Sequence, residues 1–325
     1  MKKTVVICLI MSLFFVPNAS GDKNGIKVMN WNVYIGTDVF EVLNGSITVD
    51  EAVKQFIESN PIARMKTIAG HIKILRPDVV FLQEVSQVAL LDSAFQVLGM
   101  FDFLEAIKEE LDNYELAGVH ELTDVTLETE SGYASVLDRD VIFVRKGIAA
   151  EPAEYFLYEN LLSPPNAPIT VLRGFTKVRA QINGNPYVLV NTHIEVFYPF
   201  RELQAGELAS AIGTLPDTVL VGGDFNDVPS SITYNSMVLA GFTDSWTDKI
   251  IGGWDVDGYT CCQDGELRNK FSFLDERIDY LFTLNKQFLT LSGRVIGDRQ
   301  FNKTLTIPRL WPSDHGGLIF TLYSY

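Results

Sequence analysis

Six short polar clusters of this chain each lie at, or just beyond, one end of an apolar, strand-like run. The clusters contain carboxylates, carboxamides and two histidines, which are poor choices for strand ends unless they converge in space. Converged, they would supply hard oxygen ligands for a cation and imidazoles for proton transfer. They are Asn30-Trp31-Asn32, Leu82-Gln83-Glu84, Asn191-Thr192-His193, Gly223-Asp224-Phe225-Asn226, Arg277-Ile278-Asp279 and Ser313-Asp314-His315. The pattern favours a fold that gathers distant strand ends into one site.

The apolar spacing predicts ten strands and five helices. The strands are expected at 26–33, 78–82, 114–119, 141–145, 174–182, 187–192, 218–222, 278–283, 289–296 and 318–323. The helices are expected at 50–57, 61–75, 94–111, 201–215 and 232–240. Asn183-Gly184 is typical of a tight hairpin turn between two of the strands. Many hairpins with interspersed helices predict an α/β fold: a four-layer sandwich of two packed mixed β-sheets flanked by helices.

Two polar or amphipathic segments carry structural expectations of their own. Apolar residues from Phe95 to Leu111 recur at helical spacing, which favours a buried helix face over a cofactor-binding segment. The acidic run Glu121–Glu130 is expected to be a solvated loop, with a substrate lid as the alternative.

The amino-terminus has the three parts of a secretory leader. Lys2 and Lys3 precede an apolar run from Thr4 to Val16, and the small residues Ala19-Ser20-Gly21 follow. The apolar run is short for a bilayer, which needs about 20 residues. We therefore expect residues 1–21 to be a signal peptide and residues 22–325 a single catalytic domain that is secreted or periplasmic. We expect no integral membrane segment after cleavage, and a monomer.

The formal charge argues against one class of function. The whole chain carries −15, and loss of Lys2 and Lys3 with the leader lowers this to −17. A field of that sign opposes tight, nonspecific binding of nucleic acid, although a bound cation and a local basic patch could offset it. The charge therefore argues against an enzyme that scans duplex DNA.

The cysteines are few, which excludes a fold held together by many disulfides. Cys8 lies in the leader, and Cys261 and Cys262 are adjacent. In an oxidising compartment the adjacent pair is either a vicinal disulfide or two half-buried thiols.

The polar clusters have individual chemical readings. Asp224 and Asn226 can point into one cavity, where a carboxylate holds water or metal and a carboxamide donates to a phosphoryl oxygen. Glu84 follows a buried strand, so a cation is its natural partner, and Asn32 can support it. His315 offers a base near neutral pH, with Asp279 as the acceptor that fixes its tautomer.

Only four histidines occur in the chain, and two of them belong to the polar clusters. His193 and His315 close clusters beside apolar strands, so we expect them to be the functional pair. His71 lies within a predicted helix and His120 at a strand end, and both are interpreted as structural.

In type and order, these clusters resemble the endonuclease/exonuclease/phosphatase superfamily over essentially the whole mature chain. The resemblance implies the four-layer sandwich, Mg²⁺ or Mn²⁺ as cofactor, and Glu84 as principal metal ligand with Asn32 and Asp314 nearby. It implies that Asp224 and Asn226 orient water and phosphate. It also implies that His315 with Asp279 is the basic pair and that His193 stabilises the phosphorane or assists the leaving group.

The same resemblance implies a further carboxylate beside His193. Asp140 is the candidate, and Asp138 is an alternative because residues two apart share a strand face. Family members differ in which histidine is acid and which is base, so both assignments stay open.

Departures from known branches leave the substrate open. Asp275-Glu276-Arg277-Ile278-Asp279 replaces the aromatic motif of the inositol phosphatases, and 36–60 looks like an insertion. These features suggest an exported bacterial branch that differs from the well-known enzymes of the superfamily. We expect a Mg²⁺- or Mn²⁺-dependent phosphoesterase that acts on a small phosphoester, a phospholipid head group or nucleic acid by in-line water attack. The alternatives are a secreted nuclease, a sphingomyelinase-like phospholipase and, from another class, a binding module without activity. A binding module would be expected to lose Glu84, Asp224 or a histidine.

Overall fold

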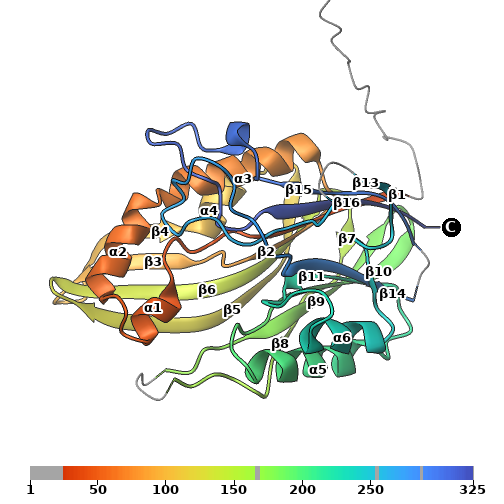
Figure 1. The fold of residues 1–325 in the computed structure, drawn as a ribbon, viewed down its shortest axis with the longest axis horizontal. Coiled ribbons are helices and arrows are strands. Elements are labelled where there is room, and N and C mark those ends of the chain that lie inside the picture. The colour runs from red at the N-terminus through yellow and green to blue at the C-terminus, as the bar shows by residue number, and fades with distance from the viewer. Residues whose placement is uncertain (1–24, 165–168, 253–255, 286–287, 325) are drawn as a thin grey trace, which may run out of the picture.

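The computed structural model describes residues 25–164, 169–252, 256–285 and 288–324. The predicted leader, with Cys8, lies outside these residues. Within the described ranges, sixteen strands form one sheet of nine and one of seven, with helices on the outer faces (Figure 1). In that part of the chain, no helix has both the length and the apolar character needed to span a membrane.

The larger sheet consists of β1 (Gly25–Asn32), β2 (Val79–Gln83), β3 (Gln87–Asp92), β4 (Val97–Asp102), β5 (Tyr114–Thr129), β6 (Gly132–Arg145), β13 (Lys249–Gly252), β15 (Phe288–Ile296) and β16 (Gly317–Ser324). Its order is β13-β15-β16-β1-β2-β6-β3-β4, with β5 paired to β6. The pairs β1–β2 and β13–β15 are parallel and the others antiparallel, so the sheet is mixed.

The smaller sheet consists of β7 (Ala149–Ala150), β8 (Glu154–Leu157), β9 (Gly174–Ile182), β10 (Asn185–His193), β11 (Val219–Asp224), β12 (Thr243–Asp244) and β14 (Asp279–Leu284). Its order is β12-β14-β11-β10-β9-β7, with β8 paired to β9. The predicted Asn183-Gly184 turn joins β9 to β10, and both of its residues have positive φ, as a tight hairpin turn requires.

The helices are α1 (Val39–Leu43), α2 (Val49–Glu58), α3 (Pro61–Leu75), α4 (Phe103–Lys108), α5 (Phe200–Ile212) and α6 (Ile232–Leu239), with a short 3-10 helix η1 (Gln300–Asn302). Sequence signals set several of their ends. Thr48 and Glu51 form a reciprocal capping box at the start of α2. Pro61 begins α3, where the missing N–H of proline costs no hydrogen bond within the helix.

Three apolar clusters fill the space between the four layers. Along β2, Phe81 points between the two sheets, whereas Val80 and Leu82 point to the opposite face beneath α3 and α4. A third cluster joins the other face of the smaller sheet to α5 and α6. Each large apolar side chain that is fully buried contributes about 1.5–3 kcal/mol to stability. This arrangement confirms the predicted four-layer sandwich.

The predicted helix at 94–111 was wrong in its first half. Val97–Asp102 forms β4 and pairs with β3, and the helix α4 begins only at Phe103, where the Asp102 side chain accepts from Glu105 N–H. Asp92 Oδ1 accepts from the N–H groups of Ala94 and Gln96 and so fixes a hairpin turn. Turn chemistry and strand pairing therefore overrode the helical spacing.

The acidic run 121–130 is not a loop. Its first nine residues belong to β5, which pairs with β6 as far as Thr129 opposite Gly132. Side chains along this stretch alternate between more and less exposed positions, as expected for a strand at the edge of a sheet. The acidic residues are therefore the solvent-facing half of a strand, and the expected loop or lid does not form there.

Candidate active site

The site lies where strand ends of the two sheets meet. In the larger sheet, parallel pairing of β1 with β2 puts Asn32 beside Gln83, the residue before Glu84. In the smaller sheet, β10 and β11 are parallel and place His193 beside Asp224, while β14 places Asp279 on the other side of Asp224. Parallel strands bring their carboxyl ends to the same edge of a sheet, which explains why residues distant in sequence converge here.

A buried layer of amides lies directly below and holds the two sheets in register. Gln83 Nε2 donates to Asn30 Oδ1 at 2.9 Å and to Asn191 Oδ1 at 2.6 Å. Asn30 in turn donates across the sheets to the carbonyl of Gly223 at 3.1 Å. Because an unpaired buried amide is costly, these bonds favour one relative position of the sheets.

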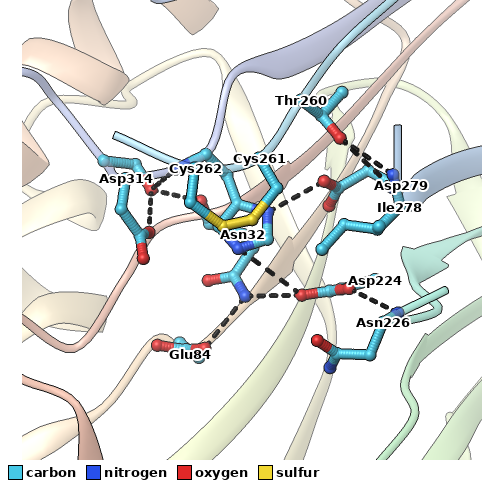
Figure 2. The surroundings of a disulfide bond; sticks show 12 residues. Asn32, Glu84, Asp224, Asn226, Thr260, Cys261, Cys262, Ile278, Asp279 and Asp314 are labelled. Atoms are coloured by element: carbon cyan, nitrogen blue, oxygen red, sulfur yellow. Dashed lines mark hydrogen bonds and ion pairs between the residues drawn. A yellow bond between two sulfur atoms is a disulfide. The ribbon is translucent and has the colours of Figure 1, made fainter. Parts of the chain in front are cut away.

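Asn32 connects the two halves of the site. Its Nδ2 donates to Glu84 Oε1 and to Asp224 Oδ2, both at 2.9 Å, and Figure 2 shows these two bonds diverging from the Asn32 side chain. The other Glu84 oxygen accepts from the Ile35 N–H at 2.8 Å. Glu84 has a φ of 58°, a left-handed conformation that is strained for a residue with a side chain and often marks a functional position.

The carboxylates around Glu84 repel one another. Burial, followed by the charges of Asp314 and Asp138, raises the pKa of Glu84 to about 7. Burial likewise raises the pKa of Asp314, although His315 and Arg64 oppose the shift. A divalent cation between Glu84 and Asp314 would relieve this repulsion, and oxygen donors of this kind suit Mg²⁺ or Mn²⁺. The residues expected to hold the metal therefore suit a divalent cation.

A second group of donor atoms lies on the other side of Asn32. Asp224, Asp279 and His315 each offer one atom within 4.8 Å of the others. Within this group, His315 Nδ1 lies 2.8 Å from Asp279 Oδ2, which is the predicted pairing. Burial alone would lower the pKa of His315, but the charges of Asp279, Asp314 and Asp224 outweigh burial and raise it well above its usual range.

Asp224 lies between the two histidines. Its Oδ2 is 3.6 Å from His193 Nε2 and 3.8 Å from His315 Nε2. Burial and the Asp279 carboxylate raise the pKa of Asp224 to about 6. Asn226 donates its backbone N–H to Asp224 Oδ1 at 2.9 Å, and its side-chain nitrogen lies 3.1 Å from His193 Nε2.

The neighbour of His193 Nδ1 is an arginine. Arg173 Nη1 is 2.8 Å from this nitrogen, and the expected carboxylate Asp140 makes no hydrogen bond or ion pair with His193 among the described residues. A guanidinium only donates, so Nδ1 accepts from Arg173 and the neutral ring carries its proton on Nε2. The Asn226 side-chain nitrogen, 3.1 Å from Nε2, then meets it as a second donor and forms no hydrogen bond with it. Burial, then the Arg173 charge and His315, lower the pKa of His193 well below its usual range.

Asp140 is buried behind this arginine. Burial followed by the Asp138 charge raises its pKa well above the usual range, and the charge of Arg173 and the backbone N–H of Glu84 oppose this shift. Asp138 Oδ2 lies 3.6 Å from Arg173 Nη1, and Glu195 Oε2 lies 3.9 Å from Arg173 Nε. Of the two carboxylates considered in the sequence, Asp138 therefore reaches His193 through Arg173, and Asp140 has no ion pair with either residue among those described.

Sequence reasoning missed three residues of the site. Arg173 had a usable signal, since a two-residue turn at Asn183-Gly184 puts Gly174 opposite His193 and Arg173 just beyond. Arg64 is fully buried and donates to the carbonyls of Val33, Tyr34 and Pro312, but its place in an amphipathic helix gave no such indication. Thr260 Oγ1 accepts from the N–H groups of Ile278 and Asp279, and nothing in its local pattern suggested it.

Solved structures show that the fold recurs in proteins of different activity. An endonuclease/exonuclease/phosphatase from Bacteroides vulgatus is 16% identical, with 93% of this chain and 99% of that chain covered and a TM-score of 0.59. A mannosyl-6-phosphatase from Bacteroides thetaiotaomicron is 17% identical, covering 91% and 99%, with a TM-score of 0.59. TDP2 from D. rerio, complexed with a single-strand DNA product, is 16% identical, covering 92% and 98%, with a TM-score of 0.55. At these identities, the likeness concerns the fold alone.

No curated protein matches the sequence of this chain significantly. A family model does match, and it covers residues 29–315. The matched range runs from β1 to His315 and so contains every polar cluster from which the site is built. The chain belongs to the endonuclease/exonuclease/phosphatase family.

Proposed function

We propose that this protein is an exported, Mg²⁺- or Mn²⁺-dependent hydrolase of phosphoesters. One observation carries the proposal: buried carboxylates lie beside two histidines, of which one contacts a positively charged arginine and the other a negatively charged aspartate. Export is supported by the leader sequence at residues 1–21.

Glu84 and Asp314 would hold the cation, with Asn32 fixing the Glu84 carboxylate, and the cation would neutralise charge on the phosphoryl oxygens. His193 Nε2 faces Asp224, and the Asn226 side-chain nitrogen lies beside this Nε2, so both groups can donate to a phosphoryl or leaving-group oxygen. Asp224 positions the attacking water. The water's proton passes to Asp224, the member of the linked unit of Asp224, His315 and Asp279 that positions the water and can still accept a proton, because His315 is already charged.

A small phosphoester fits the charges near the site better than a long polyanion. Arg64 is fully buried and donates to backbone carbonyls. Four other arginines near the site are already bound to carboxylates: Arg173 to Asp138 and Glu195, Arg201 to Asp227 and Glu202, Arg139 to Asp102 and Arg277 to Asp244. A polyanion would have to compete with these pairs and would be repelled by a net charge of −15, which becomes −17 when Lys2 and Lys3 are lost with the leader. The fold's occurrence in a mannosyl-6-phosphatase makes a sugar phosphate the first substrate to test.

Nucleic acid is the second candidate, because the same fold occurs in TDP2 bound to a single-strand DNA product. The two candidates differ in salt dependence. Hydrolysis of a sugar phosphate should change little with salt, whereas binding of a nucleic acid weakens steeply as salt rises.

The test is a panel of a sugar monophosphate, sphingomyelin, plasmid DNA and single-stranded DNA, measured as kcat/KM with Mg²⁺ or Mn²⁺. We expect hydrolysis that vanishes with chelator and returns with the cation, and that is lost in Glu84→Gln. Undiminished hydrolysis in excess chelator would contradict the metal site. Failure to hydrolyse any phosphoester with either cation would contradict the proposed function.

A further inference from the structure

The residues 260–263 form a short segment that includes a disulfide between adjacent cysteines, Cys261 and Cys262. In Figure 2 this disulfide lies above Asn32, with the side chains of Asp314 and Asp279 to either side. One atom from each cysteine and one ring nitrogen of His315 all lie within 4.8 Å of one another. The sulfurs therefore neighbour an imidazole of the candidate active site.

Backbone hydrogen bonds fasten this segment on both sides of His315. The N–H of Gln263 donates to the carbonyl of Asp314 at 2.7 Å, and the N–H of Gly316 donates to the carbonyl of Thr260 at 2.7 Å. His315 and the two cysteines are thus held at one place by bonds that do not involve the sulfurs. Reduction of the disulfide would leave these bonds in place, so the three side chains would stay together.

A second set of bonds fastens the segment to the strand that carries Asp279. Cys261 N–H donates to the Glu276 carbonyl at 2.9 Å, and Glu276 N–H donates to the Cys261 carbonyl at 3.0 Å. Thr260 Oγ1 accepts from the N–H groups of Ile278 and Asp279, at 3.3 Å each. Cys261 itself is buried, whereas Cys262 reaches solvent, where a reductant can contact it.

The ligand chemistry of these three residues differs between the two redox states. In the disulfide the sulfurs are bonded to each other and are not thiolate ligands. In the reduced state, two thiolates and one imidazole form the donor set typical of Zn²⁺ or Cd²⁺ rather than Mg²⁺. This set is separate from the carboxylates Glu84 and Asp314, which suit a hard cation.

We propose that Cys261, Cys262 and His315 form a redox-gated site for a soft divalent cation such as Zn²⁺ or Cd²⁺. A dithiol reductant opens the site: it breaks the S–S bond, transfers two electrons and two protons to give two thiols, and is itself oxidised to a disulfide. When the cation binds, the two thiols lose two protons and the charged His315 ring loses one, all three to solvent, so that two thiolates and one imidazole nitrogen supply three ligands. Oxidation to the disulfide closes the site.

The consequence for activity rests on the proposed function. A ring nitrogen that binds a metal cannot exchange a proton, and a metal-bound His315 is no longer free to serve Asp224 and Asp279. The reduced, loaded protein should therefore be inactive, while the oxidised protein should ignore the same cation. The phosphoesterase would therefore be active under oxidising conditions. Under reducing conditions, a soft metal ion bound to the two cysteines would inhibit it.

The test measures Cd²⁺ binding directly, so it does not depend on activity. The full chain carries Cys8→Ser throughout, which leaves Cys261 and Cys262 as its only cysteines. Oxidised and phosphine-reduced protein are compared by equilibrium dialysis and by the ultraviolet charge-transfer band of Cd²⁺–thiolate bonds, with Mg²⁺ in excess. We expect one Cd²⁺ per chain with the thiolate band after reduction, and neither before it.

Two variants sharpen this result. Cys261→Ser/Cys262→Ser is the matched control and should bind no Cd²⁺ in either state. His315→Ala keeps both thiols and should weaken Cd²⁺ binding by at least about tenfold, because losing a ligand costs no less than losing a group that only supports a ligand. Circular dichroism of each protein checks that it remains folded.

The proposal is overturned if reduced protein binds no more Cd²⁺ than the double serine variant, or if His315→Ala binds Cd²⁺ as tightly as the parent. Activity is then compared on any phosphoester that the oxidised protein hydrolyses. Equimolar Cd²⁺ should inhibit the reduced protein alone. Tight Cd²⁺ binding without any phosphoester hydrolysis would uphold the soft-metal site and count only against the proposed function.

Discussion

His193 and His315 are the same side chain in opposite surroundings. His193 ends a strand of the smaller sheet and meets the Arg173 guanidinium at Nδ1, whereas His315 precedes a strand of the larger sheet and meets the Asp279 carboxylate at Nδ1. Burial, and after it the Arg173 charge, lowers the pKa of His193, whereas the charges of Asp279, Asp314 and Asp224 outweigh burial and raise the pKa of His315. The Nε2 atoms of both rings are within 4 Å of Asp224 Oδ2.

The comparison shows how the group that contacts Nδ1 influences Nε2, the nitrogen that faces Asp224: it favours either a hydrogen-bond donor or a ring that holds an extra proton. A donor at Nδ1 leaves His193 neutral with a proton on Nε2, so it can donate a hydrogen bond. A carboxylate at Nδ1 of His315 favours the charged ring and disperses a proton taken up at Nε2. One site thus contains a fixed neutral donor and a unit that holds a proton.

The largest expected effect comes from removing either ring. His193→Ala and His315→Ala should each lower turnover by roughly 10²–10⁴, the usual worth of general acid–base groups. Both rings contact other site residues rather than the apolar clusters, so Tm should change little. A variant whose activity falls only in proportion to its loss of folded protein would make that histidine structural.

A smaller loss is expected when the partner of His315 loses its charge. Asp279→Asn keeps the shape of the side chain but removes the carboxylate 2.8 Å from Nδ1, so the pKa of His315 should fall. Turnover should drop by roughly 10–100-fold, the scale for removing a group that orients a reactive side chain. The pH dependence of kcat should shift with the pKa, and a fall in kcat with no shift would indicate a purely structural role for Asp279.

The reciprocal experiment removes the positively charged guanidinium that contacts His193. In Arg173→Met the guanidinium is lost while the nearby carboxylates Asp138 and Glu195 remain, so the pKa of His193 should rise. Arg173→Lys is the matched control, because it retains the charge. The readout is the imidazole NMR titration of His193. An unchanged titration in Arg173→Met would mean that burial alone keeps His193 neutral and would break the comparison.

The smallest expected effect concerns the pH dependence of stability and comes from a third histidine, His120. Burial lowers the pKa of His120 to about 4 from 6.5. Between these values the unfolded chain binds a proton that the folded chain does not, so His120 makes stability fall as pH falls from 6.5 toward 4. His120→Gln should flatten the loss of unfolding free energy in that window and leave it unchanged above. Equal slopes for both proteins in urea titrations would show that His120 is not buried neutral.

The sequence carried enough information to predict most strands and the residues that meet at the site. Strand ends are easy to read because apolar runs stop at polar clusters, and parallel pairing then gathers those ends, as Asn32, Glu84, His193 and Asp224 illustrate. The helix α3 was predicted at 61–75 and is found there, since its start is marked by Pro61 and one face by regularly spaced apolar residues.

The failures have physical causes outside the local sequence. The helix expected at 94–111 was replaced in part by β4, because pairing with β3 is a long-range choice that helical spacing does not record. The partner of His193 was expected to be a carboxylate, but β9 brings Arg173 to that nitrogen and leaves Asp140 behind it. The strand register set by the Asn183-Gly184 turn could have revealed the position of Arg173. The contacts of Arg64 with backbone carbonyls depend on packing alone and left no such signal.

The most direct test is an imidazole NMR titration of the chelator-treated protein, with each histidine assigned by substitution. We expect His315 to carry protons on both ring nitrogens at neutral pH, while His193 carries one, on Nε2. The two rings should titrate far apart, on opposite sides of the ordinary value of about 6.5. Two rings that titrate together near that value would contradict the division of roles between a neutral donor and a proton-holding unit.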